Sequence, residues 1–248
     1  MKILKCIICD SPIFFIKDSE NYKISKCVSC GLEFSNPMPT KKKINSFYSN
    51  YSDIRASNNL VLEKNARRIY KYLKINYKVN KKSNLLDYGS GKNSFVEGNK
   101  PNFFKSYDPY TSNNDEKLLI KNSYDVITFL GVLEHLTDVR KTCTYLFSLL
   151  KKGGILVITT IDINQIIPFR YKPPEHTIYF TKSSIFKLFK GHKILEYKPY
   201  RMIQDSKIYI NILHRSMSNV HKKLNYNIMP KFIEIPTNEI FTVIQKIN

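Results

Sequence analysis

Glycine and proline are scarce in this chain, and long apolar runs are missing. The 248 residues include 8 glycines and 11 prolines, together about 8% of the chain against roughly 12% on average. This scarcity excludes collagen-like, linker-like and low-complexity sequences. Apolar residues make up 42% and aromatic residues 13%, which is enough for a hydrophobic core and excludes a disordered chain.

No apolar stretch approaches the ~20 residues that a membrane-spanning helix needs. The start, Met1–Asp10, also has no apolar segment typical of a signal peptide. We therefore expect a soluble, cytoplasmic protein. The length fits one large domain or two small ones, and no internal repeat is visible.

Acidic residues are few, 20 against 40 basic ones, giving a formal net charge of +20. The excess lies in residues 1–84 and 161–248, whereas residues 85–160 are nearly neutral. A polyanion such as nucleic acid is therefore a possible partner. It is not favoured, because the excess is mostly lysine. Lysine is common in A/T-rich genomes, whereas nucleic-acid surfaces more often use arginine with interleaved aromatics.

Two Cys-x-x-Cys pairs, Cys6/Cys9 and Cys27/Cys30, stand out in the first segment. Two such turns can place four thiolates tetrahedrally around one zinc ion. Between the pairs, two short strands joined by a polar turn are expected at Ile13–Lys17 and Tyr22–Lys26. The sequence therefore predicts a zinc ribbon over residues 1–36 with one structural zinc, since four protein ligands leave no open coordination position.

Two disulfides or a redox-active cysteine pair are the alternatives for these cysteines. A reducing cytosol disfavours disulfides, and thioredoxin-like chemistry needs one pair at a helix start. Cys143 stands alone in a helical stretch and is expected to be a buried small hydrophobe.

A helical connector is predicted over residues 37–83. Thr40 would cap a short helix at Lys41–Tyr51, and a longer helix is expected at Asn59–Lys78. The polar stretch 80–84 then marks the boundary of a central domain.

The central domain, predicted over 84–214, begins with a strand, Leu85–Tyr88. The turn Gly89-Ser90-Gly91-Lys92-Asn93 follows and opens a helix at Ser94. Such a turn brings bare backbone N–H groups against a nucleotide cofactor. A second strand, Phe103–Tyr107, ends in Asp108, about 20 residues after the glycines, where an acid can accept hydrogen bonds from ribose hydroxyls.

Strands and helices go on alternating after Asp108. The next expected elements are listed in chain order: strand Asp125–Phe129, helix Asp138–Leu150, strand Ile155–Thr160, helix Ser183–Lys190 and an antiparallel pair Lys193–Tyr200 and Ile208–Leu213. This order predicts an α/β fold, a doubly wound, mostly parallel Rossmann-like sheet beside the small ribbon. The tail, 215–248, has no predicted role, although Phe241–Ile244 could form a strand.

The motifs of the central domain, taken together, resemble those of class I S-adenosylmethionine-dependent methyltransferases. They are Leu85–Gly91, Tyr124–Phe129 with Leu133-Glu134-His135, and Leu150–Ile158 with its Lys-Lys-Gly-Gly turn. The resemblance implies that Asp87, Gly89 and Gly91 contact the methionine and ribose portions of the cofactor. It also implies that Asp108 holds the ribose hydroxyls and that Leu130 and Gly131 line the pocket.

The ribbon followed by residues 31–37 also resembles the N-terminal segment of a bacterial methyltransferase subgroup, several of which act on sugars or other small metabolites. Two departures from the family pattern stand out. Lys92-Asn93 occupies the place of a third small residue, with Asn93 a candidate substitute. The stretch between Asp108 and Asp125 is too short for the usual helix, strand and loop near the adenine. Leu118–Ile120 could be a remnant strand, and Asp115 or Glu116 a substitute acid.

The segment Pro173–Thr181 contains the best candidate for a general base, His176, preceded by Glu175. Imidazole titrates near neutral pH and can take a proton from an acceptor. Pro-Glu-His-x-x-Tyr-Phe is similar to a segment of sugar C-methyltransferases, and to a looser pattern in O-methyltransferases. Alternatively, His176 packs under a lid. Glu134 and His135 are expected to orient the loop over the cofactor. Tyr48 and Tyr51 could cover the cofactor or could equally be buried aromatic residues.

The sequence therefore predicts an S-adenosylmethionine-dependent methyltransferase of a small metabolite, a sugar or nucleotide-sugar. The small-molecule acceptor is thus expected to be a carbohydrate. Two alternatives remain open: an RNA methyltransferase that uses the basic flanks, and a non-catalytic binding module that keeps the fold.

Overall fold

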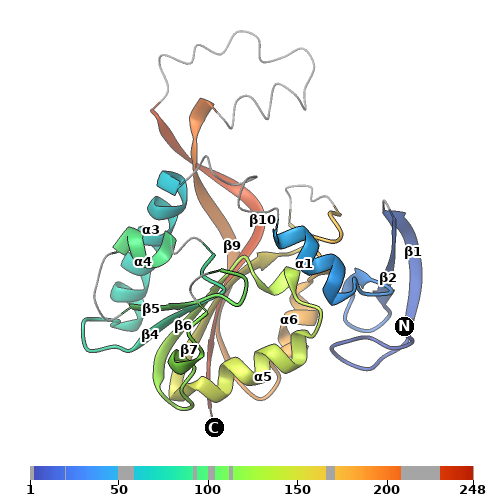
Figure 1. Cartoon of the computed structure of the whole chain (residues 1–248), viewed down its shortest axis with the longest axis horizontal. Coiled ribbons are helices and arrows are strands. Elements are labelled where there is room, and N and C mark those ends of the chain that lie inside the picture. Colours follow the sequence, from blue (N-terminus) through green and yellow to red (C-terminus); the bar gives the residue numbers. More distant parts are fainter. Residues whose placement is uncertain are drawn as a thin grey trace.

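The computed structural model describes residues 3–19, 21–49, 59–91, 94–99, 104–111, 114–165, 171–207 and 230–247. Within them the chain forms one six-stranded and one four-stranded sheet (Figure 1). The predicted α/β fold with a mostly parallel central sheet is confirmed.

The central sheet has the strand order β5-β4-β6-β7-β10-β9. In that order the strands are Phe104–Tyr107, Leu85–Tyr88, Tyr124–Leu130, Leu150–Ile161, Phe232–Gln245 and Lys193–Asp205. Strands β5, β4, β6 and β7 are parallel, whereas β10 is antiparallel to both β7 and β9. Strand β9 therefore pairs with β10, and the expected partner Ile208–Leu213 lies outside the described residues.

Strand β10 lies within residues 215–248, the tail for which the sequence predicts no role. It lies between β7 and β9, where Val243 pairs with Val157 of β7 and with Glu196 of β9. A register shift between Pro236 and Ile240 interrupts its pairing with β9. This irregularity obscures the two-residue period by which strands are recognised, so only the last part of β10 was foreseen from the sequence.

The second sheet has the order β1-β2-β3-β8 and contains both predicted ribbon strands. Its strands are Ile13–Ser19, Tyr22–Cys27, Glu33–Ser35 and Ile178–Tyr179. The last of them, β8, belongs to the segment that carries the candidate base. The ribbon and this distant segment therefore share one sheet.

Helices cover both faces of the central sheet (Figure 1). On one face lie α3 (Asn59–Tyr77) and α4 (Ser94–Asn99), and on the other α5 (Val139–Leu149) and α6 (Lys182–Leu188). Helix α1 (Lys41–Ser49) contributes Ile44 to the cleft described below. Short 3-10 turns, η1 (Glu116–Leu118) and η2 (Leu133–His135), lie before and after β6. Each helix begins within a residue or two of the predicted position; Asp138 caps α5 by accepting a hydrogen bond from the Lys141 N–H at 3.2 Å.

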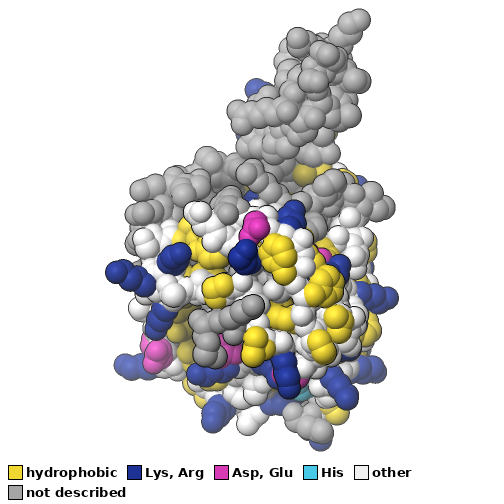
Figure 2. Space-filling model, turned by 90° about the vertical axis from the view of Figure 1, so that its right-hand side faces the viewer, with side chains coloured by type: hydrophobic (Ala, Val, Ile, Leu, Met, Phe, Trp, Pro, Cys, Tyr) yellow, Lys and Arg dark blue, Asp and Glu magenta, His cyan; other side chains and the backbone are white. Residues whose placement is uncertain are grey.

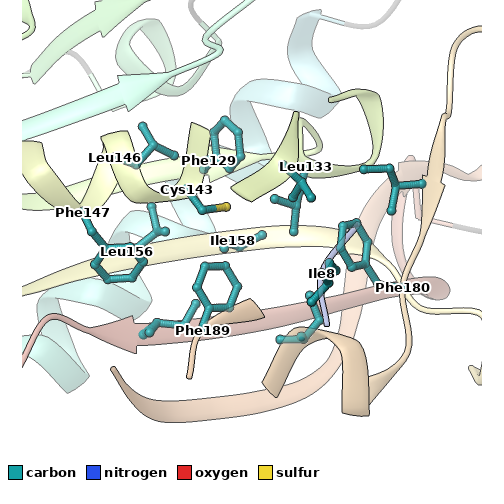
Figure 3. Close-up of a cluster of buried hydrophobic side chains, with 14 of the residues drawn as sticks. Ile8, Phe129, Leu133, Cys143, Leu146, Phe147, Leu156, Ile158, Phe180 and Phe189 are labelled. Atoms are coloured by element: carbon teal, nitrogen blue, oxygen red, sulfur yellow. The ribbon is translucent and has the colours of Figure 1, made fainter. Parts of the chain in front are cut away.

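Two hydrophobic clusters lie on opposite faces of the central sheet because neighbouring strand residues point to opposite sides. Leu85 packs with α3 and α4, whereas Leu86 packs with α5. The α5 cluster also includes α6 and the ribbon, and Figure 3 shows Ile8 of the ribbon close to Phe180. Cys143 is buried in this cluster, as predicted.

On the face that carries the ribbon, Lys and Arg side chains are dispersed between hydrophobic ones (Figure 2). The exposed hydrophobic residues of the ribbon include Leu4, Phe14, Phe15 and Val28. None of the described helices combines the length and the apolar character required to cross a lipid bilayer.

Candidate active site and metal centre

A cleft of about 780 Å³ opens at the carboxyl ends of the parallel strands. In the chain, β4 is followed by β5, which lies on one side of β4 in the sheet, and then by β6, which lies on its other side. The direction in which successive strands are added to the sheet therefore reverses at β4. Ligands of open α/β sheets bind at such a switch point. Residues of α3, β9 and β10 line the opposite wall.

The six residues expected to bind the cofactor all line this cleft. They are Asp87, Gly89, Gly91, Asp108, Leu130 and Gly131. The structure thus brings together residues from the ends of β4, β5 and β6, as the alternation of strands and helices implied.

The glycine turn leaves open space for a ligand. Gly89 has φ +76°, and a Cβ there would lie 2.6 Å from Val132 Cγ2, so the turn cannot accept a larger residue. At Gly91 and Gly131, both with positive φ, a Cβ would meet nothing within 4 Å. The buried Ser90 hydroxyl has no hydrogen-bond partner among the described residues. An open backbone cradle and an unsatisfied hydroxyl fit a bound cofactor.

Asp108 fastens the glycine turn to the end of β5. Its carboxylate accepts hydrogen bonds from the N–H groups of Gly91 and Tyr110, both at 2.8 Å. The side chain is 8% exposed and lines the cleft. A carboxylate offers about four acceptor positions, so ribose hydroxyls can bind beside these two donors.

The short connection between β5 and β6 forms no strand within residues 114–123, so the remnant strand considered at Leu118–Ile120 is not formed. Asp115 is exposed and caps η1 by accepting a hydrogen bond from the Lys117 N–H at 3.0 Å. Neither Asp115 nor Glu116 lines the cleft, whereas Tyr110 does.

His176 also lines the cleft and is 9% exposed. Its imidazole meets that of His135 edge-to-face, with ring centroids 4.7 Å apart. Glu175 is not among the residues that line the cleft. Its carboxylate Oε1 lies 3.9 Å from His176 Nε2, beyond hydrogen-bond distance.

Glu134 and His135 hold the loop that contains His176. The Glu134 carbonyl accepts a hydrogen bond from the Thr177 N–H at 2.8 Å. The His135 ring nitrogen Nδ1 lies 2.7 Å from the Glu175 carbonyl. A carbonyl can only accept, so His135 carries its proton on Nδ1. These contacts are those expected of a pair that orients the loop.

Some cleft residues were not singled out from the sequence. Ile44 of α1, Lys172, Asn238 and Glu239 all line the cleft. Asn238 and Glu239 lie where the pairing of β10 with β9 is interrupted. In the sequence, Pro173 next to Lys172 and Pro236 before Asn238 are the signals that indicate irregular backbone at these positions. Tyr51, Lys92 and Asn93, and the side chain of Tyr48, lie outside the described residues.

The four paired cysteines converge at the base of the ribbon. Their sulfurs lie within 4.8 Å of one another, with Cys6–Cys30 at 3.6 Å and Cys9–Cys27 at 3.5 Å. Four thiolates bound to zinc at about 2.3 Å are separated by roughly 3.8 Å, so the arrangement fits that ion. The N–H groups of Ile8, Ser29 and Cys30 also point at these sulfurs, at 3.4 Å.

The sequence matches the methyltransferase-domain family over residues 61–192, more than half of the chain. This chain belongs to the methyltransferase family. It is an S-adenosylmethionine-dependent methyltransferase, and none of the curated proteins matches it.

Solved structures share the fold at low identity. An S-adenosylmethionine-dependent methyltransferase from Thermotoga maritima, described as a possible histamine N-methyltransferase, has 12% identity and a TM-score of 0.52, covering 82% of this chain and 99% of its own. A Burkholderia thailandensis 1,6-didemethyltoxoflavin-N1-methyltransferase, solved with 1,6-didemethyltoxoflavin and S-adenosylhomocysteine, has 10% identity and a TM-score of 0.52, covering 94% and 99%. An Archaeoglobus fulgidus S-adenosylmethionine-dependent methyltransferase has 13% identity and a TM-score of 0.52, covering 81% and 100%.

Asp87 contributes a buried carboxyl group to the methyltransferase cleft. It is 4% exposed and accepts a hydrogen bond from the Thr128 hydroxyl at 2.7 Å. Burial raises its pKa to about 7, with a further upward contribution from the negative charge of Asp108, while the Thr128 hydrogen bond opposes the rise. The folded chain therefore holds a proton that an unfolded chain, with an aspartate pKa near 4, gives up.

This difference predicts a pH-dependent stability. Between about pH 4 and pH 7 the unfolded state binds fewer protons than the folded state, so stability falls as the pH rises. Each unit of pKa difference corresponds to about 1.4 kcal/mol, so the total fall attributable to Asp87 is a few kcal/mol. Asp87→Asn keeps the shape and removes the titration. Denaturant unfolding from about pH 4.5 to about pH 8 should show a steeper decline in wild type, and parallel curves would contradict the assignment.

Proposed function

We propose that this methyltransferase acts on a small metabolite of the sugar or nucleotide-sugar class. The observation that carries the proposal is that the glycine turn and His176 line the same cleft. Its volume of about 780 Å³ suits a cofactor and a small acceptor. The similar Burkholderia structure, solved with 1,6-didemethyltoxoflavin and S-adenosylhomocysteine, supports a small-molecule acceptor. The likeness of Pro173–Thr181 to sugar methyltransferases supports the carbohydrate class.

In this proposal the residues divide the work along the cleft. Gly89 and Gly91 leave room for the cofactor, Asp108 accepts hydrogen bonds from its ribose, and Leu130 and Gly131 form the wall beside it. S-adenosylmethionine supplies the activated methyl group. His176 takes the proton that a hydroxyl or carbon acceptor must lose, and Glu175 positions this end through its backbone carbonyl on His135.

A structural zinc ion held by Cys6, Cys9, Cys27 and Cys30 is the second part of the proposal. The purified chain should carry one zinc ion, and the double variant Cys27→Ser, Cys30→Ser should lose it, because hydroxyls cannot replace thiolates on zinc. Elemental analysis measures the content. Cys143→Ser is the matched control and should keep the zinc. Full zinc retention in the double variant would refute the four-cysteine site.

Cofactor binding tests the glycine-turn end of the cleft. Hydrogen bonds to a charged group contribute about 1.5–3 kcal/mol, so Asp108→Ala should weaken S-adenosylmethionine binding about tenfold or more. Isothermal titration calorimetry measures this. Asp125→Ala is the control, since Asp125 binds Lys151 and the Asn84 N–H and does not line the cleft. Absence of binding to wild type at millimolar cofactor would contradict the proposal.

Methyl transfer from labelled cofactor to neutral sugars, nucleotide sugars and RNA tests the acceptor end. Transfer to a sugar compound is expected, and His176→Ala should lower kcat by about 10²–10⁴ with cofactor affinity unchanged. His192→Ala is the control, because this histidine stacks on Phe147 away from the cleft. Transfer to RNA alone would overturn the substrate class, and near-normal kcat in His176→Ala would overturn the base.

A further inference from the structure

A second cluster of metal-ligating side chains lies in the described part of the chain, besides the cysteines. Glu134, His135 and His176 each offer one ligand atom, and these atoms lie within 4.8 Å of one another. Two imidazoles and one carboxylate are a ligand set that holds zinc and other first-row transition metals with coordination positions left open. The set differs in kind from the four thiolates of the ribbon.

Neighbouring groups orient two of the three ligands. The Glu175 carbonyl holds His135 by Nδ1 at 2.7 Å, which leaves Nε2 as the atom that faces Glu134. Glu134 Oε2 accepts a hydrogen bond from the Thr160 hydroxyl at 2.8 Å, while its Oε1 lies 3.9 Å from His135 Nε2. Metal-binding histidines and carboxylates are characteristically fixed by such outer contacts.

The two backbone segments that carry the ligands are fastened together. Thr177 donates from its N–H to the Glu134 carbonyl at 2.8 Å and from its hydroxyl to the Leu136 carbonyl at 2.6 Å. His176 is therefore held beside η2. Ligand atoms on an ion bound at about 2.1 Å lie roughly 3–3.5 Å apart, so closure by side-chain rotation of about 1 Å completes the site.

The surroundings favour a cation. Among the described residues that line the cleft, acidic side chains outnumber basic ones. The basic one is Lys172, and none of these residues is an arginine. The acidic ones are Asp87, Asp108, Glu134, Asp138 and Glu239. A cleft lined by one sign of charge concentrates ions of the other sign, and here it does so in a chain whose net charge is +20.

We propose that Glu134, His135 and His176 form a second metal site, which binds a first-row transition-metal dication through two nitrogens and one carboxylate oxygen. Resting on the proposed role of His176 as base, the site is inhibitory. A lone pair that holds a metal ion cannot accept a proton, so an occupied site blocks methyl transfer.

Cobalt(II) is the probe, added to protein that carries one equivalent of zinc, the amount that the cysteine site takes. Binding to nitrogen and oxygen ligands gives weak visible d–d bands without the near-ultraviolet charge-transfer band of cobalt thiolates. We expect saturable d–d bands at one equivalent. Glu134→Gln and His176→Ala should weaken binding at least tenfold, whereas His192→Ala, an unrelated histidine, should not.

Three outcomes decide the inference. Absence of d–d bands in the zinc-loaded wild type would overturn the site, and so would unchanged cobalt affinity in Glu134→Gln and His176→Ala. Cofactor titration on the same variants shows that they are folded. Cobalt should also inhibit methyl transfer in wild type. Stimulation by cobalt would support the metal site, but it would overturn both the inhibitory role of the site and the role of His176 as base. Failure of the metal site and failure of His176 as base therefore give different results.

Discussion

The pairing of β3 with β8 is the contact on which the arrangement of the active site depends. Glu33 pairs with Tyr179 and Phe34 with Ile178, and the Ser35 N–H donates to the Thr177 carbonyl at 2.9 Å. These bonds join a ribbon at the start of the chain to a loop almost 150 positions later. Because β8 is only two residues long, its own loop could not hold it in an extended conformation.

The cysteine site and the loop that carries His176 are consequently connected by hydrogen bonds. The Thr181 hydroxyl donates to the Cys30 carbonyl at 2.6 Å, and Thr181 also caps α6. On the other side, Thr177 binds the backbone of Glu134 and Leu136. A metal ion at the cysteines would fix the turn at Cys30, whose carbonyl accepts the hydrogen bond from Thr181 just after β8. The ribbon thus acts as a brace for the loop that carries His176.

The features that the sequence predicts well depend on residues close together in the chain. Gly89 and Gly91 follow a buried strand, so their turn and its position at the sheet edge follow from chain order alone. The spacing of Cys6, Cys9, Cys27 and Cys30 likewise predicted their convergence. The pairing of β3 with β8 could not be predicted, since two residues carry no periodicity and the contact depends on the folding of everything between.

If the donor binds at the glycine turn as proposed, the acidic side chains of the cleft attract its charge. The donor carries a sulfonium charge, which transfer of the methyl group removes. Asp87, Asp108 and Glu134 line the cleft, and the burial of Asp87 and Glu134 weakens solvent screening. Asp87, with a pKa raised to about 7, ionises more readily beside a cation. Loss of the sulfonium charge on methyl transfer would therefore reduce this electrostatic attraction.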